Sequence, residues 1–272
     1  LAFTFCSTYL DWILMTPKPF KLAMIQMEVR GGDPKWNLAR AREQISEAAS
    51  EGAQIILLPE CLDLGWTHPS SQVMAEAIPE GHPCTVLSAA AKEHQVYVCG
   101  GLTEKENERV YTSAVLINPE GEVVLKYRKL SELEIGHTYY AQGDRLNVTE
   151  TEYGTIGVMI CADGFANGQV ISRSLCYMGA DVILSPCAWA RPADHDNDMD
   201  PYGKVWRESY KPVAKQFSTA IFGTSNVGPI TAGPWKGRKC VGCSLAIDAA
   251  GEEMIQGPYG KDCILYANIS PQ

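Results

Sequence analysis

Apolar runs of the sequence end in a reactive polar side chain at three places: Glu60, Lys129 and Cys161. Glu60 follows IILLP, Lys129 ends VVLKYRK, and Cys161 follows IGVMI. In open α/β sheets, reactive groups gather beyond the carboxyl ends of strands, so these side chains are candidates for one site. A thiol needs a base to become a nucleophile, a shielded carboxylate can take and return a proton, and an ammonium can hold the oxyanion of an attacked carbonyl. The three residues together suffice for acyl transfer without histidine.

Strands and helices that could position these residues alternate along the chain. Asp33 followed by Pro34 predicts a helix N-terminus, and the helix is expected to run to about Ser50. The continuous apolar run 53–59 is typical of a strand covered on both faces. The turn NPEG predicts a hairpin between its flanking strands. Further elements are expected as a strand at 21–27, a helix near 83–95 and hairpin strands at 111–117 and 122–128.

Similar segments recur in the same order in the two halves of the chain. GADVILSPC (179–187) resembles GAQIILLPE (52–60), and SLAIDAAGEEM (244–254) resembles AVLINPEGEVV (114–124). AIFGTSN (220–226) stands where VYVCGGL stood in the first half. Chance similarity of βα units is the alternative explanation. We interpret the pattern as two αβ halves, whose sheets face each other in a four-layer α-β-β-α sandwich with helices outside.

The bulk composition narrows the class of protein. The 272 residues are 46% hydrophobic, with a net charge of −9, which argues against nucleic acid and anionic membranes as partners. The ten cysteines are scattered singly, so we expect mostly free thiols and a cytoplasmic location. Residues 1–19 are expected to be an N-terminal extension that packs on the domain or on a neighbouring subunit. Residues 20–272 are then the main domain.

The blocks LLPE with Glu60, YRK with Lys129 and GVMICAD with Cys161 resemble the catalytic blocks of the nitrilase, or carbon–nitrogen hydrolase, superfamily. Each block alone is weak, but their order and spacing are specific, and the resemblance covers roughly residues 20–268. It implies that Cys161 forms a thioester, that Glu60 acts as general base and acid, and that Lys129 and the backbone N–H of Ala162 bind the oxyanion. It also implies a homodimer or larger homo-oligomer with no cofactor.

One position departs from the family pattern. The family usually carries a second glutamate between the lysine and an element that here reads YAQGD, and the position at the usual spacing is Gly136. Glu134 fills the role if the loop carries a small insertion, and Glu132 is the weaker candidate. His137 or Thr138 is a candidate for contact with substrate instead.

The residues after the nucleophile indicate the reaction. Nitrile-hydrolysing relatives typically read Cys-Trp-Glu there, whereas this chain reads Cys-Ala-Asp, which favours cleavage of an amide or carbamoyl C–N bond. The substrate is predicted to be a small molecule, preferably a neutral or mainly apolar amide. Pocket candidates are Trp189, Arg191 and Trp206, although packing or surface roles explain them equally well.

The predicted function is therefore an amidase-type carbon–nitrogen hydrolase. A true nitrilase, an acyltransferase with an amine acceptor, and a catalytically silent binding protein on the same fold are the alternatives. No catalytic metal is expected, because the five histidines include no i,i+4 pair and no HExxH motif.

Overall fold

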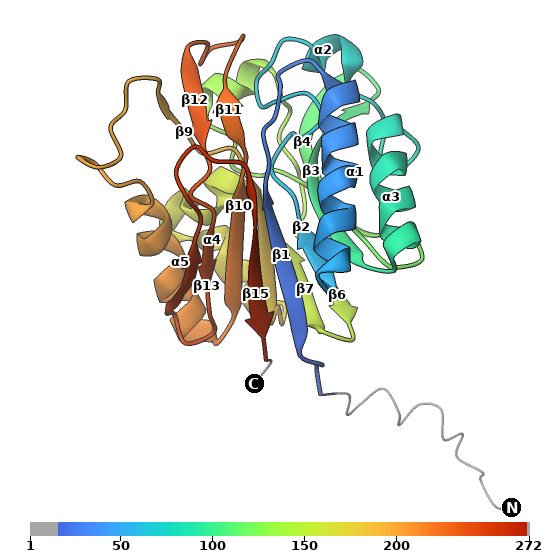
Figure 1. The fold of residues 1–272 in the computed structure, drawn as a ribbon, viewed down its shortest axis with the longest axis vertical. Helices are drawn as coiled ribbons and strands as arrows, with labels where there is room; N and C mark the ends of the chain where they lie inside the picture. Colours follow the sequence, from blue (N-terminus) through green and yellow to red (C-terminus); the bar gives the residue numbers. More distant parts are fainter. Residues whose placement is uncertain (1–15, 271–272) are drawn as a thin grey trace, which may run out of the picture.

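The computed structural model describes residues 16–270. The chain folds into a four-layer α-β-β-α sandwich, as predicted (Figure 1). Of the predicted extension 1–19, residues 1–15 lie outside the described part. Within residues 16–270, no helix combines the length and apolar composition needed to cross a membrane.

Each of the two large sheets has six strands. The first has the order β15 (Cys263–Ile269), β1 (Phe20–Gln26), β2 (Ile55–Leu57), β3 (Tyr97–Glu106), β4 (Arg109–Ile117) and β5 (Val123–Arg128). The second has the order β14 (Glu253–Gln256), β13 (Leu245–Ile247), β10 (Ala220–Ser225), β8 (Val182–Cys187), β7 (Gly154–Val158) and β6 (Val148–Thr151). A third, three-stranded sheet has the order β11 (Val227–Pro229), β12 (Arg238–Val241) and β9 (Ala190–Pro192).

The two large sheets repeat one topology. Read from β15 to β5 and from β6 to β14, both show the same series of pairings: antiparallel, parallel, parallel, antiparallel, antiparallel. Strand β2 thereby corresponds to β8, and β3 to β10. These are the segments whose sequences resemble each other, so the predicted internal repeat is confirmed.

Helices cover the outer face of each sheet. In Figure 1, α1 (Pro34–Ser50) and α3 (His82–His94) lie on one side, and α4 (Val170–Tyr177) and α5 (Lys204–Phe217) lie on the other. Helix α1 begins as predicted, because the Asp33 side chain accepts a hydrogen bond from Trp36 N at 3.1 Å. The remaining helical segments are short: α2 (Ser71–Met74), η2 (Glu134–Thr138), η3 (Cys161–Gly164) and η4 (Ala166–Gly168).

The side chains of β1 point alternately to its two faces, and this shows how the layers are held together. Leu22 and Met24 belong to the core between the two sheets, whereas Ala23 and Ile25 belong to the core beneath α1 and α3. Because successive side chains of a strand point to opposite faces, one strand serves both cores. This double burial explains why the central strands read as continuous apolar runs.

Candidate active site

Glu60 and Lys129 form a buried ion pair between segments that are far apart in the sequence. Glu60 lies just beyond β2 and Lys129 just beyond β5, and Lys129 Nζ is 2.7 Å from Glu60 Oε1. Their side chains are 1% and 2% exposed, so water screens the pair very little. The structure thus brings together two of the three predicted reactive side chains.

Strand β3 packs closely against the backbone of Glu60 and holds it in place. The N–H of Gly101 donates to Pro59 O at 3.0 Å, and a Cβ on Gly101 would lie 2.6 Å from Glu60 Cα. Only glycine fits there without moving the backbone that carries the carboxylate. On its other side, Glu60 N donates to the carbonyl of Cys187 at 3.1 Å, which ties the base to the second sheet.

A second glutamate contacts Lys129, and it is Glu132. Its Oε1 lies 3.0 Å from Lys129 Nζ, and its side chain is 2% exposed. It also accepts hydrogen bonds from Leu133 N at 2.9 Å and from the Thr112 hydroxyl at 3.2 Å. The preference for Glu134 is therefore wrong, because that residue lies exposed in η2.

Gly136 explains how Glu132 fits. A Cβ at this position would lie 2.5 Å from Glu132 Cγ and 2.6 Å from its Cδ. The residue that stands at the family's usual glutamate position therefore leaves room for a carboxylate that reaches in from four residues earlier. His137 and Thr138, the other candidates for contact with substrate, are exposed on η2 and are not among the residues that line the cavity described below.

Cys161 begins the turn η3 directly beyond β7. It is 8% exposed, and its φ of +46° lies in the left-handed region, which costs a non-glycine residue about 1–2 kcal/mol. It lines one cavity together with Glu60 and Lys129, and the charges of both residues act on its thiol. Cys161 thus joins Glu60 and Lys129 in one cluster, as the strand-end argument predicted.

The protonation states follow from burial and charge. Burial raises the pKa of Glu60 to about 7; Lys129 opposes this rise and the Glu132 carboxylate adds to it. Burial alone would lower the pKa of Lys129, but the negative charges of Glu60 and Glu132 hold it well above its ordinary value. The pKa of Cys161 is raised first by the Cys187 thiol and then by burial. At rest the site therefore holds a neutral thiol beside a carboxylate poised to take its proton.

Asp163 connects the turn of Cys161 to the segment that carries Lys129. The buried carboxylate of Asp163 accepts hydrogen bonds from Ile160 N at 2.9 Å, the Tyr127 hydroxyl at 2.7 Å and Ser131 N at 2.7 Å. Sequence reasoning used this residue only to choose between amide and nitrile, and it missed this positioning role. A charged residue directly after an apolar run was the available signal, because such a residue is rarely buried without partners.

An aromatic cavity of about 240 Å³ opens onto these side chains. Trp189 and Trp206 stack on one another in its wall, with ring centroids 4.4 Å apart. The predicted pocket residues Trp189, Arg191 and Trp206 all line it, and so does Ala162. The sequence did not single out the other lining residues: Trp66, Leu133, Phe165, Ala188, Ala190, Tyr202, Val205 and Trp235.

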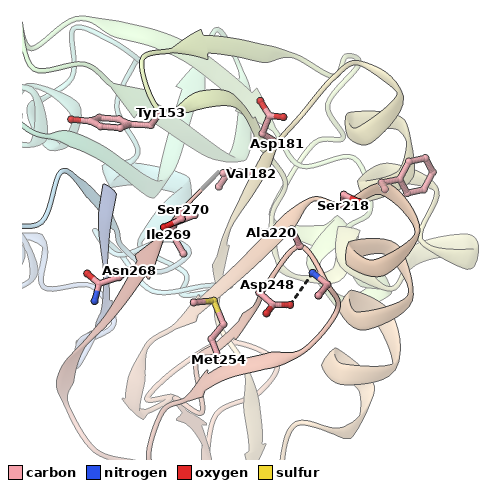
Figure 2. Close-up of a pocket in the computed structure, with 13 residues that line it drawn as sticks. Tyr153, Asp181, Val182, Ser218, Ala220, Asp248, Met254, Asn268, Ile269 and Ser270 are labelled. Atoms are coloured by element: carbon pink, nitrogen blue, oxygen red, sulfur yellow. Dashed lines mark hydrogen bonds between the residues drawn. The ribbon is translucent and has the colours of Figure 1, made fainter. Parts of the chain in front are cut away.

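A larger cavity, of about 440 Å³, lies elsewhere in the fold (Figure 2). It is lined by Asp181 and Val182 where β8 begins and by Ala220 where β10 begins, together with Asp248 in the turn before β14. The catalytic candidates lie beyond the carboxyl ends of parallel strands, and this cavity lies at the amino ends. Figure 2 shows the Asp248 carboxylate hydrogen-bonded to a backbone N–H of its own turn, that of Ala250, at 2.9 Å. The smaller aromatic cavity is therefore the one that meets the reactive groups.

Proteins of solved structure share this fold. Nit3 from Saccharomyces cerevisiae superposes with a TM-score of 0.80 at 20% identity, covering 95% of this chain and 92% of that protein. An amidase from Nesterenkonia sp. superposes with a TM-score of 0.78 at 19% identity, covering 95% and 93% respectively. At these identities the likeness establishes the fold.

Sequence relatives are named as nitrilases and amidases. A nitrilase from Pyrococcus abyssi is 34% identical over 176 residues, which cover 63% of this chain and 66% of the relative. An omega-amidase NIT2 from Homo sapiens is 32% identical over 62% of this chain and 67% of its own length. An (R)-stereoselective amidase from Pseudomonas sp. is 27% identical over 89% and 81% respectively. The chain thus matches about two thirds of the first two relatives.

The carbon–nitrogen hydrolase family model matches residues 21–272, nearly the whole chain. This match agrees with the shared fold and with the cluster of Glu60, Lys129 and Cys161. It confirms the resemblance that the three sequence blocks indicated. The chain belongs to the carbon–nitrogen hydrolase family.

Proposed function

We propose that this protein is an amidase that hydrolyses the C–N bond of a small amide or carbamoyl compound through a thioester on Cys161. One observation carries the proposal: a buried thiol, its carboxylate base and a lysine ammonium meet at the wall of one small cavity. These are the groups that acyl transfer by a cysteine requires.

Acylation begins with proton transfer. As Cys161 Sγ attacks the carbonyl carbon, Glu60 takes the thiol proton, so the thiol does not have to ionise in advance. The carbonyl oxygen becomes an oxyanion that accepts hydrogen bonds from Lys129 Nζ and from the backbone N–H of Ala162. Glu60 then gives the proton to the nitrogen, the C–N bond breaks, and ammonia or an amine leaves the thioester behind.

Deacylation uses the same groups in the reverse roles. Glu60 takes a proton from a water molecule that attacks the thioester carbon, and Lys129 again holds the oxyanion. The C–S bond breaks and the Cys161 sulfur regains its proton from Glu60. The net reaction is amide plus water to carboxylic acid plus ammonia, and the enzyme returns to its starting state.

Glu132 supports Lys129 in this scheme. Two carboxylates beside one ammonium keep it protonated, because each stabilises the positive charge. The bonds of Glu132 to Thr112 and Leu133 N fix its carboxylate, so Lys129 is held between two anchored acceptors. We assign Glu132 to positioning Lys129 as an oxyanion donor.

The cavity favours a small substrate with an apolar body. Its volume of about 240 Å³ lies below the range of about 300–1,000 Å³ typical of drug-sized ligands. Aromatic rings of Trp66, Trp189, Trp206 and Phe165 make up much of its wall, and such faces bind apolar or aromatic groups. The charge of Arg191 is paired with Asp200, which leaves little net charge to select an ion.

A panel of aliphatic and aromatic amides, carbamoyl compounds and nitriles, assayed for ammonia, tests the proposal. Ammonia release from amides is expected, and Cys161→Ala is expected to abolish it. Cys99→Ala, which alters another fully buried cysteine of the same core, serves as matched control and should keep activity. Release from nitriles alone, or release that survives Cys161→Ala, would overturn the assignment. Faster thioester turnover with added amines would instead indicate an acyltransferase.

A further inference from the structure

A second thiol, which the proposed reaction does not use, lies on the strand that packs against the turn of the proposed nucleophile. We infer that Cys161 and Cys187 form a dithiol modification site, which a hydroperoxide closes to a disulfide and a thiol reductant reopens. The inference deepens the proposed function, because closure would remove the nucleophile.

Strand pairing brings the two cysteines together. β7 and β8 are parallel neighbours in which Val158 pairs with Leu184, and Met159 N donates to Leu184 O at 3.1 Å. Cys161 and Cys187 each come three residues after this pair. Neighbouring strands lie about 4.8 Å apart where they pair, and a disulfide spans a Cα separation of about 4.4–6.8 Å. The pairing therefore brings the two segments within this range just before the cysteines.

The segments that carry the two thiols are in contact. The turn η3, which begins with Cys161, packs against β8, which ends with Cys187, and both side chains belong to the core between the sheets. Cys187 is completely buried, with its sulfur 3.2 Å from Ser185 O and 4.0 Å from the Tyr210 hydroxyl. These neighbours fix the position of the Cys187 sulfur at the end of the strand that packs against η3.

Cys161 and Cys187 differ in how a peroxide in the aromatic cavity can reach them, and this gives them different roles. Cys161 lines the aromatic cavity, whereas Cys187 is not among the residues that line it. A peroxide that enters the cavity therefore meets Cys161 first. Cys187 can react only with what forms on Cys161, which makes it the resolving thiol.

The chemistry balances with a hydroperoxide as oxidant. Cys161 sulfur attacks one peroxide oxygen, the O–O bond breaks, and the thiol proton passes through Glu60 to the leaving oxygen, giving a sulfenic acid and water or an alcohol. The Cys187 sulfur then attacks the Cys161 sulfur, the S–O bond breaks, and the leaving hydroxide takes the Cys187 proton as water. Two thiols lose two electrons and the peroxide gains them. A dithiol reductant reverses closure by thiol–disulfide exchange.

The experiment treats purified protein with hydrogen peroxide and maps cysteine oxidation by peptide mass spectrometry, beside amidase activity. We expect a Cys161–Cys187 linked peptide, loss of most of the activity, and its recovery with dithiothreitol. Without its resolving thiol, Cys187→Ala is expected to accumulate sulfinic acid on Cys161 and to recover no activity. Cys99→Ala, the matched control from the same core, should behave as the unsubstituted protein does.

Sulfinic acid on Cys161 of the unsubstituted protein, with Cys187 still reduced, would overturn the inference. A disulfide that joins either cysteine to another partner would also overturn it. If Cys187→Ala fails to fold, Cys187→Ser takes its place, and the mapping of the unsubstituted protein decides in either case. The mapping needs no substrate, so a linked peptide in a protein without amidase activity would refute the proposed function and leave this inference standing.

Discussion

The side chain of Glu132 occupies the space that a Cβ on Gly136 would need. The distance from that Cβ to Glu132 Cγ would be 2.5 Å, well inside van der Waals contact. The glycine and the glutamate therefore form one structural unit, in which the missing side chain admits the carboxylate that supports Lys129.

Gly136→Ala should displace the Glu132 carboxylate from Lys129. We expect kcat to fall, because Lys129 loses one of its two anchored acceptors, whereas Thr138→Ala on the exposed side of η2 should leave kcat unchanged. Steady-state kinetics on an amide substrate measure both. Equal activity in the two variants would contradict the coupling of Gly136 to Glu132.

The two candidate glutamates can be separated directly. Glu132→Gln is expected to lower kcat by roughly 10²-fold, the scale of removing a group that supports oxyanion binding. Glu134→Gln makes the same chemical change on an exposed side chain and should leave kcat as it is. The reverse pattern would assign the second carboxylate to Glu134 after all.

The pH dependence of kcat/KM should follow the ionisation of the Glu60 carboxyl group. Its carboxyl acts as a base only when ionised, and burial raises its pKa to about 7. We therefore expect kcat/KM to rise with pH through about 7 and then to level, because the raised pKa of Lys129 keeps that ammonium charged.

Removing the Glu132 charge supplies the control for this profile. The Glu132 carboxylate raises the pKa of Glu60. Glu132→Gln should therefore shift the rising part of the kcat/KM profile to lower pH, and it should also lower kcat/KM on the plateau. A profile that is flat across neutral pH, or a rising part that stays in place in Glu132→Gln, would rule out Glu60 as the titrating base.

Asp163 should matter for stability as well as for activity. Asp163→Ala leaves three buried donors without their acceptor, and we expect a loss of roughly 3–5 kcal/mol in the free energy of unfolding. Tyr127→Phe removes one of these bonds together with the bond from Leu130 N to the Tyr127 hydroxyl, and should cost about 1–3 kcal/mol. Urea denaturation measures both. The exposed Asp144→Ala is the control, and a loss no larger than that of the control would refute the positioning role.

Local sequence by itself determined much of this protein. The start of α1 was predictable because Asp33 and Pro34 act within one helical turn, and the buried strands were predictable because burial on both faces requires continuous apolar runs. The repeat of strand segments predicted the two sheets. Glu60, Lys129 and Cys161 were predictable because strand ends place reactive groups at one edge, and because the blocks around them resemble one family.

Only the tertiary structure decided which groups actually meet. The choice of Glu132 over Glu134 depends on the room left by Gly136, which no local propensity encodes. The bonds of Asp163 and the packing of η3 against β8 join segments that lie far apart in the sequence or on different elements. The aromatic cavity is likewise lined by residues from several elements. Sequence patterns record how a segment is buried, whereas distances between side chains depend on how separate segments pack.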